Sequence, residues 1–97
     1  MIFNPFFAII CYRMVREKMI GMILRNIRKL KGLTQVEISD KLILADNTIS
    51  NYETGYSTPT FDTIVKFLDI CDFEIQFIDK NNNKVYTIEE LSKEMDF

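Results

Sequence analysis

Short polar side chains are concentrated between positions 46 and 51. Ile49 and Tyr52 lie three positions apart there, so in a helix they would face inward together and leave the polar residues outward. A helix that only needs to be soluble more often carries Glu and Lys on its outer face. Amide and hydroxyl groups suit DNA, because Asn can bind adenine and Thr can contact a thymine methyl group or a phosphate. The outward residues are Asp46, Asn47, Thr48, Ser50 and Asn51.

Two short helices and a tight turn must position these side chains. We expect the first helix to begin after Thr34, whose hydroxyl can accept a hydrogen bond from the first turn while Glu37 reaches back to the amide of Thr34. We expect the second to begin near Ala45 to Asn47 and to run to Glu53, with Gly55 as its left-handed end. Such a pair offers its second helix to the major groove of DNA.

The segment around these helices resembles the Cro/CI-type, or XRE-like, helix-turn-helix transcriptional regulators. The resemblance covers roughly residues 20 to 70, and its spacing is more specific than that of a short motif. It implies a mainly α, lambda-repressor-like DNA-binding domain that works as a homodimer on a two-fold operator in double-stranded DNA. The residues that carry it are Leu24, Ile27, Arg28, Lys31-Gly32, Leu33-Thr34-Gln35, Leu42, Thr48-Ile49-Ser50, Tyr52-Glu53, Gly55, Pro59 and Thr60.

The resemblance also implies a role for each polar residue. Asn47, Thr48 and Asn51 are expected to read bases, and Asp46 occupies a neighbouring recognition position. By the resemblance Gln35 contacts a phosphate or a base edge, and we expect Gln35, Ser50 and Tyr56 mostly to hold phosphates. Arg28 and Glu53 match a family ion pair that ties the first helix of the domain to the end of the recognition helix.

The sequence departs from the family pattern at three places. Ile43 stands where the turn usually has Gly, so a left-handed backbone there would strain a β-branched residue. Ala45 replaces the usual Ser or Thr cap, so Asp46 or Asn47 is expected to take over the capping. The loop after Gly55 is often basic in the family, whereas here it reads Tyr-Ser-Thr-Pro over residues 56–59. This loop predicts phosphate contacts from hydroxyls and amides, and weaker or more salt-sensitive binding.

Charge is distributed unevenly along the chain. The net charge is −2, yet residues 13–41 hold eight basic and three acidic residues, while residues 42–97 hold four basic and eleven acidic. Such asymmetry lets one face attract phosphate while another stays acidic. Lys29 could simply belong to the solvated face of a helix, but beside the DNA-binding motif we expect it to contact phosphate.

Length and composition argue against catalysis. The chain has 97 residues, no His and only two cysteines, Cys11 and Cys71, which lie sixty positions apart. No zinc cluster, Cys–His pair or Ser–His relay can be assembled from this set, so we expect no enzyme activity, no catalytic residue, no metal and no cofactor. Both cysteines lie in apolar surroundings, which favours buried thiols in a reducing cytoplasm.

The first twelve residues, MIFNPFFAIICY, have three interpretations. The apolar run is too short to span a bilayer and has no preceding positive charge, so no transmembrane or secretory segment is expected. It could be an interfacial anchor, since Arg13, Arg16 and Lys18 follow it. It could pack across a dimer partner. We favour a third interpretation, in which translation starts at Met14, Met19 or Met22, with dimer packing next.

Beyond the motif, the pattern predicts a fourth helix and then a ribbon. Thr60 is expected to cap the helix, whose apolar stripe we assign to the core: Phe61, Ile64, Val65 and Leu68. Residues 73–77 alternate like a half-buried strand, residues 80–84 form a turn, and residues 85–88 can return as a second strand. Residues 89–95 are expected to form a short last helix.

The sequence thus divides into an arm at residues 1–19, a helix-turn-helix domain at 20–71 and a C-terminal element at 72–97. A lone two-stranded ribbon is marginal in water, so the C-terminal element should lie on its own helices, pair with a second chain or bind a partner protein. Strand-mediated dimers occur in antitoxin subunits that this chain weakly resembles. A DNA-binding repressor is our main hypothesis. The alternatives are an antitoxin that neutralises a toxin through residues 73–97, and a membrane-surface sensor.

Overall fold

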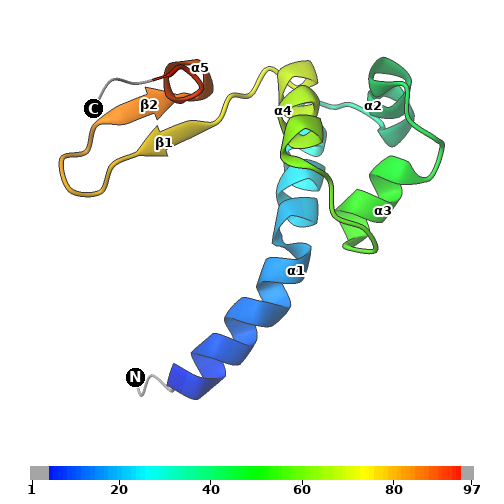
Figure 1. Cartoon of the computed structure of the whole chain (residues 1–97). Helices are drawn as coiled ribbons and strands as arrows, with labels where there is room; N and C mark the ends of the chain where they lie inside the picture. The colour runs from blue at the N-terminus through cyan, green and yellow to red at the C-terminus, as the bar shows by residue number, and fades with distance from the viewer. Residues whose placement is uncertain (1–4, 95–97) are drawn as a thin grey trace.

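The computed structural model describes the backbone of residues 5–94 and the side chains of residues 18–94. It contains α1 (Pro5–Leu30), α2 (Gln35–Leu42), α3 (Thr48–Thr54), α4 (Phe61–Ile70), β1 (Gln76–Ile78), β2 (Val85–Thr87) and α5 (Ile88–Leu91). Helices α2, α3 and α4 gather around the C-terminal half of α1, while the two strands and α5 lie beyond α4 (Figure 1). The predicted mainly helical fold with a C-terminal hairpin and a short last helix is confirmed.

All four large helices contribute to one core. Leu24 of α1, Ile38 of α2, Ile49 of α3 and Phe67 of α4 are completely buried, and Cys71 just after α4 is nearly so. Burying an aliphatic or aromatic side chain of this size contributes about 1.5–3 kcal/mol relative to leaving it exposed. The core therefore holds the helix pair α2–α3 against α1 and α4, and so sets the orientation of α3.

The helix ends follow local capping rules. The hydroxyl of Thr34 accepts a hydrogen bond from the amide of Glu37 at 3.1 Å, and that of Thr60 accepts one from the amide of Thr63 at 3.2 Å. Gly55 ends α3 in the left-handed conformation, with φ of 82°. These three predicted caps are confirmed. Of the two hydrogen bonds expected for the capping box, the described residues show only the one accepted by Thr34.

Two details of α3 and α4 correct the sequence predictions. Helix α3 begins at Thr48, one residue beyond the expected range. Asn47 takes the cap position, as one of the two predicted residues, but its side chain makes no capping hydrogen bond. In α4 the stripe was wrong in part, because Phe61 is 52% exposed whereas Phe67 is completely buried. The buried face follows positions 64, 67, 68 and 71, so Phe61, at the first turn, lies beyond the edge of the core.

The C-terminal hairpin is shorter than predicted. Strands β1 and β2 are antiparallel, with Gln76 opposite Thr87 and Ile78 opposite Val85. The first strand was expected from Phe73, but Phe73 and Ile75 are instead half-buried against the helical core, which keeps them out of the ladder. Helix α5 covers only residues 88–91 rather than 89–95.

Helix α1 crosses the predicted boundary between the arm and the domain without a break. The division at residue 19 therefore stays a prediction. Residues 1–4, and the side chains of residues 5–17, lie outside the described part, so the three interpretations of residues 1–12 stay open. Within the described residues, no helix combines the length and apolarity needed to cross a membrane.

Candidate nucleic-acid interface

The turn between α2 and α3 keeps a left-handed residue although it lacks Gly. Ile43 has φ of 54° and ψ of 53° and ends α2, with its amide donating to the carbonyl of Asp40. Left-handed backbone at a non-glycine residue costs about 1–3 kcal/mol. The side chain of Ile43 is 92% exposed, so burial does not offset this cost. The turn therefore keeps the left-handed backbone of the family pattern, and Ile43 is strained in it.

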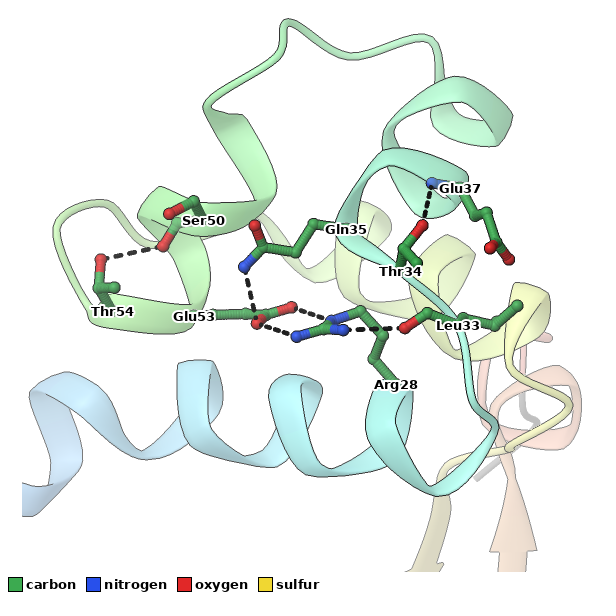
Figure 2. Close-up of polar contacts among 8 residues, drawn as sticks. All are labelled: Arg28, Leu33, Thr34, Gln35, Glu37, Ser50, Glu53 and Thr54. Carbon is green, nitrogen blue, oxygen red and sulfur yellow. Dashed lines mark hydrogen bonds and ion pairs between the residues drawn. The ribbon is translucent and has the colours of Figure 1, made fainter.

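A bidentate ion pair connects α1 to α3 (Figure 2). In Arg28, Nε donates to Oε2 of Glu53 at 2.7 Å and Nη2 donates to Oε1 at 2.9 Å. Nη1 of Arg28 donates to the carbonyl oxygen of Leu33 at 2.8 Å. The hydrogen bond to Glu53 raises the pKa of the Arg28 guanidinium, although burial acts in the opposite direction. The pair that the resemblance implied is thus present, and it is buried.

Gln35 joins this network from the start of α2. Its Nε2 atom donates to Oε1 of Glu53 at 3.2 Å, so one carboxylate receives donors from both α1 and α2 (Figure 2). A primary amide carries two N–H donors, and the second is left for another acceptor such as a phosphate. Glu53 therefore ties together the three helices whose relative positions define the candidate interface.

Gly21 lets α1 approach the end of α3 closely. A Cβ atom at position 21 would clash with the carbonyl oxygen of Tyr52 and would lie 2.9 Å from that of Glu53. Only glycine fits here without moving one of the helices. Gly21 was not among the predicted residues, although Gly inside a helix costs about 1 kcal/mol relative to Ala and so indicates close packing.

The residues predicted to contact DNA lie around α3. Asp46 and Asn47 are exposed in the turn, and Thr48, Ser50 and Asn51 are half-buried in α3. Tyr56 follows in the loop after α3 and is 84% exposed. Because Asn47 makes no capping hydrogen bond, its side-chain amide is not committed to the helix end. The structure therefore brings Gln35, the turn and α3 together through Glu53 and Ile49.

Basic residues line the flank of α1 beside α3. Gly21 and Arg28 contact α3, and helical spacing places Lys18 and Arg25 on the same strip, with Lys29 next to it. Lys18 lies against Gly55, so close that a Cβ atom there would be 2.8 Å from its Cγ atom. Lys18 falls within the predicted arm, because nothing local signals a contact with a residue so far along the chain.

The comparisons with known proteins agree with this geometry. Residues 24–78 match the helix-turn-helix family, and this match covers more than half of the chain. The chain belongs to the XRE-like helix-turn-helix family. Its lambda-repressor-like fold accords with that membership.

This helix-turn-helix protein is similar to the HTH-type transcriptional regulator ImmR of Bacillus subtilis (strain 168). The two are 32% identical over 59 residues, which cover 61% of this chain and 46% of the regulator. The chain therefore spans about half the length of the curated relative that it matches. No solved structure matches it.

Outside the interface, a small hollow lies between α4 and α5 of this helix-turn-helix protein. Its volume is about 40 Å³, and Val65, Leu68 and Ile88 contribute to its wall. Sites for drug-sized ligands usually measure about 300–1,000 Å³, so this hollow does not suit such a ligand. Among the residues that the structure describes, no group of three or more His, Cys, Asp or Glu side chains is arranged to hold a metal ion.

Proposed function

We propose that this chain is a sequence-specific regulator of transcription that binds double-stranded DNA as a homodimer and represses by occupying a promoter in the cytoplasm. The observation that carries the proposal is the position of α3. The helix is anchored on its inner side by Ile49 and Glu53, and it leaves short polar side chains on its outer side. A rigidly held helix with such an outer face suits the reading of base edges in the major groove.

The side chains divide into two groups by chemistry. Asn47, Thr48 and Asn51 would read bases, with Asp46 beside them. Phosphates would be held by Gln35, which has a spare amide hydrogen, and by the hydroxyls of Ser50 and Tyr56. Lys29 would add a charge contact from the flank of α1, which lies beside α3.

Fluorescence anisotropy can test this proposal. The full chain is titrated into labelled DNA from upstream of its own gene, with scrambled DNA as the control, across a salt series. We expect two chains per site and an affinity for the upstream DNA about 10³-fold or more above that for the scrambled DNA. Equal affinities for the two DNAs, over the whole salt range, would contradict a role as a sequence-specific regulator of this promoter.

One observation favours a second candidate function, that of an antitoxin-type module that binds a toxin and regulates its own operon. Phe77, Ile78 and Val85 of the hairpin are 41%, 60% and 44% exposed, and an apolar ribbon of this kind is suited to contact a partner protein. Co-expression with the product of the neighbouring gene tests it. A stable complex that Phe77→Lys abolishes while DNA affinity is unchanged would support this function. A complex that survives the substitution, or no complex, would count against it.

A further inference from the structure

Helix α1 has a second apolar stripe, on the side away from the core. Met19, Met22, Ile23 and Leu30 are 43%, 50%, 43% and 75% exposed, and Asn26 between them is also exposed. Their spacings of three and four residues place all five on one face. Leu24, which is completely buried in the core, lies on the opposite face, and the half-buried Ile27 lies between the core and the stripe. A helix face that is exposed to water is usually polar. Four large apolar side chains in one stripe therefore indicate a surface that binds a partner.

The length of α1 points to a helical partner. Its 26 residues run well beyond the other helices, and the N-terminal half leads away from the body of the domain (Figure 1). Among the residues whose side chains are described, Lys18 lies against Gly55, which ends α3. A helix extension of about a dozen residues is marginal in water by itself. In the sequence, the same spacing of three and four continues upstream through Val15, Tyr12 and Ala8.

This pattern is the heptad of a coiled coil. Met19 and Asn26 are seven apart and occupy one class of seam position, and Met22 occupies the other, while Ile23 and Leu30 flank the seam. The next seam position is Lys29, so the apolar part of the seam ends before it. The 26 residues of α1 have room for about 3.7 heptads, and in the sequence the seam positions from Ala8 to Met22 all carry apolar or aromatic residues. A single Asn in the seam fixes register and oligomeric state, because it pairs well only with another Asn at the same level.

We infer that α1 pairs with α1 of a second copy of this chain, in parallel, along the stripe formed by Met19, Met22, Ile23, Asn26 and Leu30. Charge determines the direction. In a parallel pair Lys18 lies beside the partner's Ile23 and Arg25 beside the partner's Leu30, so that their aliphatic stems cover apolar side chains. In an antiparallel pair the cationic flanks would face each other. The inference deepens the homodimer of the proposed function, but it is tested without DNA and can fail separately.

Sedimentation equilibrium of the full chain without DNA is the experiment. We expect a dimer for the unaltered chain and at least about tenfold weaker association for the double variant Met19→Lys/Ile23→Lys. Val36→Lys is the matched control, because Val36 is 66% exposed but lies on α2, and this variant should remain dimeric. Circular dichroism shows whether each variant stays folded. Asn26→Ile should associate at least about tenfold more tightly, because it removes a polar residue from an apolar seam.

A cross-linking variant tests the direction of pairing. Met19→Cys is placed in a chain that also carries Cys11→Ser, while Cys71 stays buried. Under mild oxidation a parallel pair brings the two new thiols together and gives a disulfide-linked dimer. A monomeric unaltered chain would overturn the inference, as would a dimer that resists Met19→Lys/Ile23→Lys but dissociates on Phe77→Lys. If the monomer binds anionic vesicles through the same stripe, the stripe is a membrane contact and the inference of pairing is overturned.

Discussion

The guanidinium of Arg28 on α1 and the carboxylate of Glu53 on α3, from residues 25 positions apart in the chain, form a buried, two-point contact. The side chains of Arg28 and Glu53 are 11% and 2% exposed. Planar groups that meet in this way fix orientation as well as distance. The contact therefore determines how the C-terminal end of α3 lies against α1, and with it the direction in which α3 presents its outer face.

Removing one member of this pair should be strongly destabilising. In Glu53→Ala the guanidinium of Arg28 stays buried without its charge partner, and we expect the free energy of unfolding to fall by about 3–5 kcal/mol. Urea denaturation measures this change. The control is Arg28→Met/Glu53→Leu, which replaces both charges by apolar groups and should lose much less. Equal losses in the two variants would show that packing, and not charge pairing, dominates at this contact.

A methyl group at position 21 should push α1 and α3 apart. Ala is the better helix former by about 1 kcal/mol, yet in Gly21→Ala its Cβ atom would clash with the carbonyl oxygen of Tyr52. We expect a net loss of about 1–3 kcal/mol in unfolding free energy, and a larger loss for Gly21→Val. Thermal unfolding gives the order of stability. A variant Gly21→Ala that is more stable than the unaltered chain would contradict the close approach.

Relieving the strain at the turn should stabilise the protein. Ile43→Gly removes a β-branched residue from a left-handed conformation without losing buried surface, so we expect unfolding free energy to rise by about 1 kcal/mol. Val36→Gly is the matched control, since it removes an exposed apolar side chain from the first turn of α2 and should cost about 0.3 kcal/mol. If Ile43→Gly destabilises as much as Val36→Gly does, the turn is not strained.

Base reading and phosphate binding should separate in DNA titrations. Asn51→Ala is expected to cost about 1–3 kcal/mol of binding free energy and to relax base choice at one operator position. Lys29→Ala should weaken binding to every sequence and reduce the slope of affinity against salt by about one. Fluorescence anisotropy with a set of single-base operator variants distinguishes the base contact of Asn51 from the phosphate contact of Lys29. An equal loss on all sequences for Asn51→Ala would make Asn51 a backbone contact instead.

Alkaline pH should reduce the stability that Cys71 provides. The thiol is 1% exposed, and burial raises its pKa. Above the ordinary thiol pKa of about 8.5, the Cys71 thiol ionises in the unfolded chain but keeps its proton in the folded chain. This stabilises the unfolded state relative to the folded state. We therefore expect the difference in unfolding free energy between the unaltered chain and Cys71→Ala to shrink from about pH 8 upward. A difference that stays constant to about pH 10 would mean that the thiolate is tolerated in the core.

Short-range rules explain why much of the helix-turn-helix could be predicted. The cap of Thr34 on Glu37 and that of Thr60 on Thr63 each close a hydrogen bond over three positions, so residue type and spacing suffice. Gly55 takes a left-handed conformation for a reason that is equally local. Boundaries shifted by a few residues where a second local signal, or packing against the core, competed with the pattern. Helix α3 begins at Thr48, and the first strand begins at Gln76 after Phe73 and Ile75 turned to the core.

The sequence by itself determined the order of the helices, their caps and the set of polar residues that α3 could offer to DNA. Only the tertiary structure decided that Gly21 meets the carbonyl of Tyr52, that Lys18 lies beside Gly55, and that Phe67 is buried while Phe61 is exposed. It also showed that the apolar stripe around Met22 stays uncovered. The physical reason is range: a cap depends on neighbours within one turn, whereas burial depends on how distant helices cross.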